Sequence, residues 1–537
     1  MDNLYSISRI PVPRKPEAER YQNLPYEPRF YSDSVERFDL PRTWRLVPGD
    51  SADAVPALSR RGLSAGEKRG ATTTQEAQIQ HLFARASFGL TVAEAQALAA
   101  TTPAEAVDLL LEEPPMPEPP GEWVREPFDF QEYQRWSQEE QMAFLQKNFE
   151  RFQLHRMWQF ELMMATAFNL REKMTLFWHG HFTSDIQSAV LAQIMFIQND
   201  TWRKHALGNF RDFLKAMYKD PCMLLYLNGV QNSAAHPNEN FARELLELFT
   251  MGVGNYTEDD IKEAARALTG WRFDTKSWVS FLYPPEHDYG TKTFLGRTGN
   301  FGADDIIDII LEQEVTARFI CRKLYEFFVS RELNEDFINE LANTFRSNDY
   351  EIKPVLRQLF TSEFFYTEDV TASIIKSPID LTVSNARRLS VQSVNVFFLV
   401  FAAAVLDQEL FQPPNVAGWP GQRAWISPTT YVLRNTVSEI FVNEDLLRDP
   451  NTNEPPVRFD PLEFARSFGL SGAQELLDAM TGHLLRLPVS EQTRDSLLSV
   501  LVGTADPNDW SLEYPGADRQ VKEFLIQVLR LAEHHLT

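Results

Sequence analysis

The sequence predicts a mainly α-helical protein, with a large multi-helix domain and a small β-hairpin or irregular excursion. Between about residues 130 and 250, and again from residue 303, apolar residues recur with the 3.6-residue period of helices. β-formers, a Pro-Pro pair and scattered Gly occupy residues 271–300 and predict the excursion. A chain of 537 residues with 43% hydrophobic side chains can bury a substantial core.

The composition divides the chain into three predicted segments: an arm, a main domain and an appendage. Residues 1–75 are rich in Pro, Arg, Glu and Ser with little periodicity, which predicts an extended N-terminal arm. Its aromatic residues favour an arm that covers part of the body: Tyr5, Tyr21, Tyr26, Phe30 and Tyr31. Residues 76–447 form the predicted main helical domain, and residues 448–537 a helical C-terminal appendage. The stretch NTNEPPVRFDP, 451–461, resembles a linker between them.

Capping residues in the sequence predict where several helices begin. Thr91 and Glu94 have the spacing of a capping box, and Ser427 followed by Pro428 fits the N-cap and first position of a helix. The apolar run SVNVFFLVFAAAVLDQEL, residues 393–410, predicts a central buried helix.

The most informative stretch begins at Asn238 with NENFARELLELFTMG. Asn238 can cap a helix that Gly252 ends, and this helix sets Arg243, Glu244 and Glu247 among apolar residues. Two interpretations remain open, because a charged stripe is either the solvated edge of a helix or the wall of a polar site.

The motif FWHGHF holds His179 and His181 on either side of a glycine. Side chains two residues apart point in nearly opposite directions on a helix, so the two imidazoles converge only if the chain leaves the helix near Gly180. With Glu244 and His287 they would form a shell for a divalent metal ion. The alternative is that these histidines and glutamates make structural hydrogen bonds and ion pairs.

Other residues complete the hypothetical site. Glu247 or Asp288 would act as the general base. Candidate substrate-binding residues are Arg243, Lys292, Trp419 and Trp425. Each has a structural alternative: an ion pair of Arg243 with Glu239 or Glu247, a solvated turn for Lys292, and packing against the body for the two tryptophans.

Composition excludes several classes of protein. A formal charge of −23 opposes non-specific binding to nucleic acid or anionic membranes. Cys222 and Cys321 lie in apolar helical surroundings, which excludes a disulfide framework and predicts two buried thiols. No window has the length of a membrane span. The motifs GxSxG, Walker A, GxGxxG, CxxC and HExxH are absent from the sequence.

Five motifs together resemble a large bacterial family called domain of unknown function eighteen hundred. They are HLFARASFG at 81–89, KMTLFWHGHF at 173–182, the stretch that begins at Asn238, HDYGTKTFLG at 287–296 and PPNVAGWPGQRAWI at 413–426. The resemblance covers roughly residues 76–440 and implies a fold family without a settled reaction. It also implies that relatives are often exported and often encoded beside a sulfatase-like family.

The N-terminal segment has no apolar h-region, so the sequence as it stands predicts a cytoplasmic protein, or a start that is not the native one of an exported protein. Two functional hypotheses remain. One is a metal-assisted enzyme built on the His and Glu residues, and the other is a non-catalytic helical scaffold or accessory subunit that docks a sulfatase-like partner.

Overall fold

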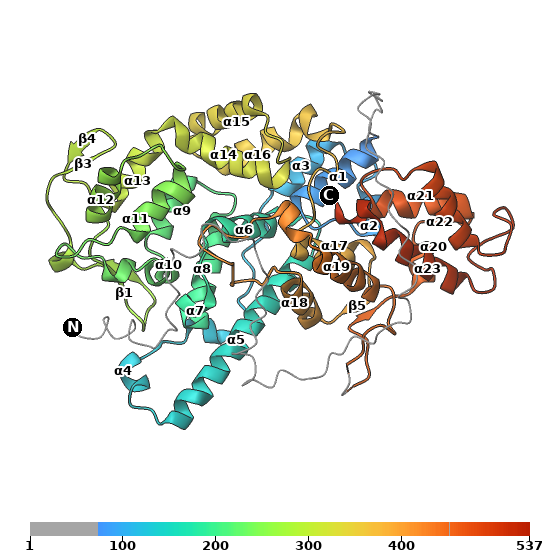
Figure 1. The fold of residues 1–537 in the computed structure, drawn as a ribbon, viewed down its shortest axis with the longest axis horizontal. Coiled ribbons are helices and arrows are strands. Elements are labelled where there is room, and N and C mark those ends of the chain that lie inside the picture. The colour runs from blue at the N-terminus through green and yellow to red at the C-terminus, as the bar shows by residue number, and fades with distance from the viewer. Residues whose placement is uncertain (1–73, 450–451) are drawn as a thin grey trace.

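The computed structural model describes residues 74–449 and 452–537, and the prediction of a mainly α-helical protein is confirmed (Figure 1). The predicted arm, residues 1–75, lies almost wholly outside the described residues. Strands in the described part form three short antiparallel pairs, β1 with β2, β3 with β4 and β5 with β6. No helix within the described ranges has the length and apolarity needed to cross a membrane.

The first ten α-helices run from the end of the undescribed segment to the centre of the molecule. Capping boxes at Thr91, Thr102 and Ser137 start α2, α3 and α5, so the predicted Thr91–Glu94 box is confirmed. The helices are α1 (Gln75–Ala86), α2 (Val92–Ala97), α3 (Pro103–Leu111), α4 (Phe130–Tyr133), α5 (Gln138–Met164), α6 (Leu170–His181), α7 (Ile186–Ala189), α8 (Ala192–His205), α9 (Phe210–Met217) and α10 (Pro221–Tyr226).

The next group contains the predicted excursion, which consists of two hairpins. β1 (Trp271–Phe273) pairs with β2 (Ser280–Leu282), and β3 (Lys292–Phe294) pairs with β4 (Arg297–Gly299). The helices of this group are α11 (Asn240–Glu244), the π-helix Leu245–Thr250, α12 (Glu258–Ala267), α13 (Ala303–Glu312), α14 (Glu314–Phe328), α15 (Glu335–Ser347) and α16 (Ile352–Thr361).

The C-terminal group packs against α5 and α1. Ser427 caps α19 and Pro428 is its first residue, as predicted. The elements are α17 (Pro378–Arg388), β5 (Ser393–Val394), α18 (Val396–Val405), α19 (Pro428–Ile440), β6 (Val457–Arg458), α20 (Pro461–Arg466), α21 (Ala473–Leu484), α22 (Glu491–Val502) and α23 (Ala517–Arg530). Short 3-10 turns lie at 122–125, 229–231, 284–286, 363–366, 422–425 and 532–535.

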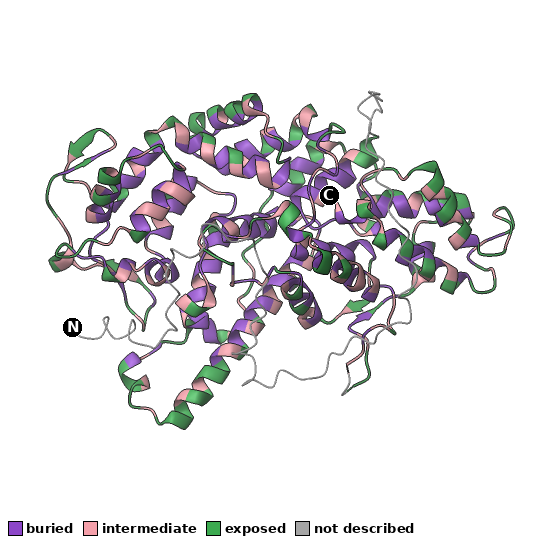
Figure 2. Cartoon of the chain, viewed as in Figure 1, coloured by how far each residue is buried: buried purple, intermediate pink, exposed green. Residues whose placement is uncertain are grey.

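A continuous hydrophobic core extends from Ile79 in α1 to Leu529 in α23, and the buried faces of the helices turn toward it (Figure 2). The segment predicted as an appendage contributes to this core, and β6, which lies within the predicted linker 451–461, pairs with β5. The apolar helix α18 is not fully buried, because Phe401 remains 44% exposed at the molecular surface. Cys222 and Cys321 are buried free thiols.

Candidate functional site

Helix α6 continues through Gly180 and ends at His181, so the predicted break at Gly180 is wrong. His179 and His181 therefore point to different sides of the helix, as helical geometry requires for residues two apart. His179 packs on Trp202 of α8, whereas His181 contacts Phe249 of the π-helix. The two imidazoles do not converge.

His179 lies in a cage of aromatic side chains and is 1% exposed. The backbone N–H of Phe411 donates to its Nε2 at 2.8 Å, and its ring stacks on Trp202 with centroids 4.7 Å apart. Trp419 closes the cage edge-on at 4.9 Å. Burial lowers the pKa of His179 to about 3, so the ring is neutral. Half-buried Trp419 thus packs on α6, which is the structural alternative predicted for it.

His181 holds α6 against the π-helix. Its Nε2 donates to the carbonyl oxygen of Phe249 at 3.0 Å. Burial, and to a smaller extent the positive charge of Lys323, lower the pKa of His181 to about 3. A neutral imidazole that donates to a backbone carbonyl joins two elements, and its occupied nitrogen is not available as a metal ligand.

The three candidates near the second hairpin are also held by structural contacts. His287 donates from Nδ1 to the Thr269 carbonyl at 2.8 Å. Arg266 binds Asp288 through Nε at 2.7 Å and holds the pKa of that carboxyl below its usual value. Lys292 is 1% exposed and donates to the carbonyl oxygens of Asp288 and Gly290 at 2.6 and 3.0 Å. The prediction of a solvated turn for Lys292 is therefore wrong.

The predicted metal ligands His179, His181, Glu244 and His287 do not gather into a metal shell. Among residues 74–449 and 452–537, no group of three or more His, Cys, Asp or Glu residues has an arrangement that could hold a metal ion. A nitrogen of each of the three imidazoles is already engaged by a backbone group. The residues do not fit a shared metal, and metal binding by this chain stays a prediction.

Glu244 and Glu247 lie where the helix changes its geometry. Glu244 ends α11, and Glu247 lies in the π-helix, whose turns each contain an additional residue. The N–H groups of Met251 and Gly252 both donate to the Leu246 carbonyl, and Gly252 leaves the helix at φ +79°, the left-handed conformation that glycine tolerates best. π-Helical turns often occur at functional sites.

The environment of Glu244 differs from that of the other candidates. Within the described part of the chain this half-buried carboxyl makes no hydrogen bond and no ion pair. Burial and the neighbouring charge of Glu247 raise its pKa, and Arg243 opposes the shift. Glu247 accepts a hydrogen bond from the Tyr256 hydroxyl at 3.0 Å. The two carboxyls are therefore coupled and differ in their hydrogen bonding.

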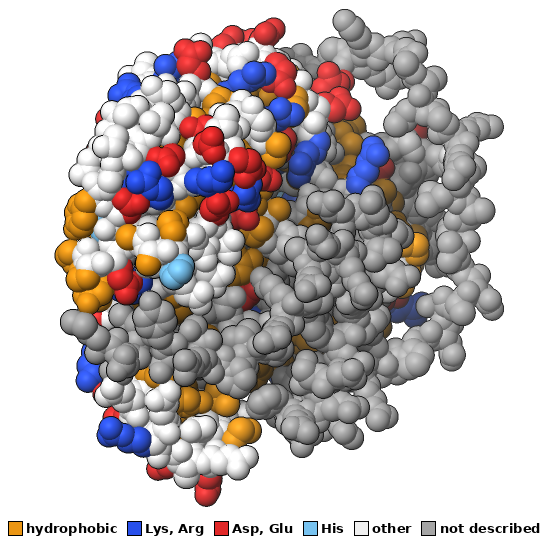
Figure 3. All heavy atoms as spheres, turned by 60° about the vertical axis from the view of Figure 1, so that its left-hand side comes forward, with side chains coloured by type: hydrophobic (Ala, Val, Ile, Leu, Met, Phe, Trp, Pro, Cys, Tyr) orange, Lys and Arg blue, Asp and Glu red, His pale blue; other side chains and the backbone are white. Residues whose placement is uncertain are grey.

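Arg243 lies beside the pair but is committed to other partners. It binds both oxygens of Glu258, at 2.9 and 2.8 Å, and Glu239 at 3.1 Å. The predicted ion pair with Glu239 is confirmed, whereas Glu247 pairs with Tyr256 instead. Figure 3 shows acidic and basic side chains intermixed on this side of the molecule, as such networks produce.

Trp425 is 5% exposed and ends the 3-10 turn 422–425 in the loop after Gly418, and its predicted role in substrate binding stays a prediction. This loop lies against the end of α6, because the Thr183 hydroxyl donates to the Val416 carbonyl and Gly418 approaches the carbonyl oxygen of Gly180. The loop therefore covers the C-terminal end of α6.

The model of the family described as "Protein of unknown function (DUF1800)" matches residues 81–521. The chain belongs to the DUF1800 family. The match extends beyond the resemblance seen at residues 76–440 and includes most of the C-terminal helices. No curated protein and no solved structure matches the chain.

Sequence reasoning missed two residues beside the carboxyl pair of this DUF1800 protein. Tyr256 lies nine residues after Glu247 in an irregular turn, and no helical spacing links them. Tyr226, at the end of α10, is near enough for Glu244 to raise its pKa, although burial is the larger cause and Asp185 also contributes. Neither tyrosine follows a helical or strand spacing from the glutamates, so local patterns carried no signal for them.

Proposed function

We propose that this DUF1800 chain is an enzyme that performs general acid–base catalysis at the pair Glu244 and Glu247. The observation that carries the proposal is the environment of Glu244: a half-buried carboxyl with a raised pKa and with no hydrogen bond or ion pair in the described chain. Carboxyls with perturbed pKa values in such surroundings are candidates for catalytic acids.

The two carboxyls have different surroundings and therefore different roles. Glu244 retains its proton to a higher pH than an ordinary glutamate and supplies the general acid. Glu247 accepts the Tyr256 hydrogen bond and serves as the general base. A general acid and a general base in adjoining parts of one helical segment support the cleavage of a polar bond by water.

Tyr226 adds a hydroxyl to this region. Burial and the charges of Asp185 and Glu244 raise its pKa, so the hydroxyl stays protonated at neutral pH. Arg243, which is bound to Glu258 and Glu239, is assigned a positioning role next to the pair. No metal-dependent step is assigned.

The test is hydrolysis of a panel of chromogenic esters, phosphate esters and glycosides by the full chain and by Glu244→Gln. We expect turnover of at least one class by the wild type and a loss of about 100-fold or more in kcat in the variant. Glu340→Gln, an exposed glutamate on α15, is the matched control and should keep full activity. Equal activity of wild type and Glu244→Gln on a substrate that is turned over would contradict the proposal.

A second candidate function is docking of a protein partner, and the exposed half of α5 favours it. This half projects from the body beside α4 (Figure 1), and its Met142 and Leu145 are 53% and 42% exposed. Exposed apolar side chains at helical spacing are typical of protein contacts. The sulfatase-like protein implied by the family resemblance is the proposed partner.

Co-purification tests this second candidate. The chain and the sulfatase-like protein encoded beside it would be mixed and separated by size. Met142→Glu with Leu145→Glu should abolish a joint peak and leave the unfolding temperature unchanged, because neither side chain belongs to the core. Val432→Glu, a similarly exposed apolar residue on α19, is the control. A joint peak that survives the double substitution would exclude the α5 surface.

A further inference from the structure

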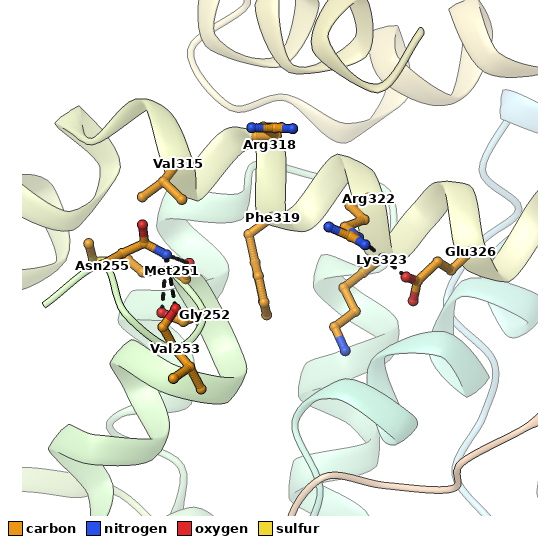
Figure 4. A pocket seen from close by; sticks show the side chains of 10 residues that line it. All are labelled: Met251, Gly252, Val253, Asn255, Val315, Arg318, Phe319, Arg322, Lys323 and Glu326. Carbon is orange, nitrogen blue, oxygen red and sulfur yellow. Dashed lines mark hydrogen bonds and ion pairs between the residues drawn. The ribbon is translucent and has the colours of Figure 1, made fainter. Parts of the chain in front are cut away.

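A cavity of about 530 Å³ lies between the end of the π-helix and helix α14 (Figure 4). The segment Met251–Asn255 forms one wall, and residues of α14 from Val315 to Glu326 form the other. Its volume is in the range of pockets that hold small organic molecules. Asn255 ties the first wall together, because its side-chain amide donates to the Met251 carbonyl at 2.9 Å.

Positive charge concentrates at this cavity although the chain as a whole carries −23. Arg318, Arg322 and Lys323 line it. Arg318 pairs with Glu335 at 2.8 Å, and Arg322 lies at 3.4 Å from Glu326 and 3.8 Å from Glu335.

Glu326 is also shared with Arg331, at 3.3 Å. Among the residues that line the cavity, three cations thus stand against one carboxylate, Glu326, which is a surplus of two positive charges in the lining. A surplus of this kind in an acidic protein favours an anionic ligand.

Lys323 is the cation with the least compensation. Within residues 74–449 and 452–537 its ammonium group has no hydrogen bond and no ion pair, and it lies 5.5 Å from the centroid of the Phe319 ring. In Figure 4 this group extends away from Arg322 and Glu326. Burial lowers the pKa of Lys323, so its charged form is incompletely solvated and would gain from an anion.

The remaining lining is apolar. Phe319 and Val315 of α14 face the cavity, and Met251 and Val253 contribute from the opposite wall. A ligand that fills this space needs an anionic head for the cations and an apolar body for these side chains.

We propose that the cavity binds a small organic phosphate monoester, with its dianionic head held by the cations of the α14 wall, Lys323 and Arg322, and its apolar body against Phe319. A dianion matches the surplus of two positive charges. Lysine binds phosphate as a point charge, and the arginine fork matches two phosphate oxygens. The site uses residues other than Glu244 and Glu247 and does not depend on their catalytic role.

Calorimetric titration of the full chain in phosphate-free buffer tests the assignment, with phenyl phosphate as the probe. We expect saturable binding of one equivalent, and at least tenfold weaker binding by Lys323→Met, which removes the charge and keeps most of the side-chain length. Lys323→Arg should restore most of the affinity. Lys522→Met on α23, the same substitution at a half-buried lysine remote from the cavity, should bind like the wild type.

Two further measurements distinguish the contribution of the phosphate head from that of the apolar body of the ligand. Inorganic phosphate should bind more weakly than phenyl phosphate, and phenol should not bind measurably. Arg322→Met provides a second variant of the head site and should also weaken binding of phenyl phosphate tenfold or more. Absence of phenyl phosphate binding to the wild type, unchanged affinity in both Lys323→Met and Arg322→Met, or equal affinity for inorganic phosphate would overturn the proposal.

Discussion

Two helical segments that contact each other differ in whether their buried or half-buried glutamates have hydrogen-bond and ion-pair partners. Helix α6 is regular and almost wholly buried, and its Glu172 binds Arg203 through two hydrogen bonds of 2.6 and 3.0 Å. The segment of α11 and the π-helix is irregular, and its Glu244 has neither hydrogen bond nor ion pair in the described chain. His181 joins the two segments through the Phe249 carbonyl.

The difference distinguishes a carboxylate whose partners hold it in place from a carboxyl that has no such partners in the described chain. A buried carboxylate persists when a cation and further hydrogen bonds replace its water, and Gln159 also donates to Glu172 at 2.6 Å. Such a group is fixed by its hydrogen bonds. Glu244 keeps partial access to solvent and has no such partner within the described chain, and for this reason the proposed acid–base chemistry is assigned to it. Buried charge alone is therefore a poor guide to function.

The largest expected effect comes from breaking the structural pair. Glu172→Gln leaves the guanidinium of Arg203 buried without its countercharge, because the side chain of Arg203 is 0% exposed. We expect a loss of about 3–5 kcal/mol in the free energy of unfolding. Urea unfolding followed by circular dichroism measures it.

The double substitution Glu172→Gln with Arg203→Met is the control for this experiment and should recover part of the loss, because no unpaired charge remains. A loss below about 1 kcal/mol in the single variant, within the range of exposed ion pairs, would remove the contrast between the two segments.

The imidazoles of α6 give the next effect, which depends on pH. Burial lowers the pKa values of His179 and His181 to about 3, so the unfolded chain binds their protons more readily than the folded chain. Their contribution to stability is complete above about pH 6.5 and is lost as the pH falls toward 3. Between these limits each imidazole should reduce stability by about 1.4 kcal/mol per pH unit.

Urea unfolding between pH 7 and pH 5 measures this slope. His179→Gln should make the slope of the free energy of unfolding against pH shallower, because about one proton fewer is taken up on unfolding. The variant should also be less stable at pH 7, because the contact of the ring with Trp202 is lost. The same slope in wild type and variant would mean that His179 is not held neutral by the fold.

Sequence patterns predicted the features that depend on residues close together in the chain. The Thr91 capping box and the N-cap at Ser427 depend on residues three or four apart, and both were predicted. For residues 271–300, β-formers and turn residues predicted a small β-hairpin or irregular excursion, and the structure has two hairpins there. Likewise the charged stripe of Glu244 and Glu247 was visible as polar residues in an apolar helix.

The surroundings of the candidate residues were not predictable, because they come from distant segments. His179 accepts from Phe411, which lies 232 residues along the chain, so spacing within FWHGHF could not distinguish a cage residue from a metal ligand. The π-helix was missed because it requires the same apolar residues as an α-helix. Lys323 was missed because its cavity forms between α14 and the segment after the π-helix.

A smaller effect of opposite sign is expected at Glu244. Its pKa is raised in the folded chain by burial and by Glu247, so its contribution to stability is present below its ordinary pKa and is lost as the pH rises through the raised value. Glu244→Gln is neutral at every pH and should equal or slightly exceed the wild type in stability at pH 7, by less than about 1 kcal/mol. Urea unfolding at pH 4 and pH 7 measures the difference.

Glu247→Gln is the companion variant. It exchanges the acceptor of the Tyr256 hydroxyl for an amide oxygen that can still accept, so stability should change little while activity is lost. A loss of about 3–5 kcal/mol in either variant, with wild-type activity, would place the pair in the same structural class as Glu172 and Arg203.

The smallest effect tests the regularity of α6 itself. Gly180 lies one residue before the end of the helix, and a Cβ built there meets no atom within 4 Å. Gly180→Ala should therefore stabilise the protein by about 0.5–1 kcal/mol, because alanine loses less backbone entropy in a helix than glycine. Gly418→Ala is the control of opposite sign and should destabilise the protein. The φ of Gly418 is +80°, and an added Cβ would lie 2.3 Å from the Gly180 carbonyl oxygen. If the chain left the helix at Gly180 to bring His179 and His181 together, Gly180→Ala would destabilise the protein instead, and thermal unfolding of the two variants decides between these outcomes.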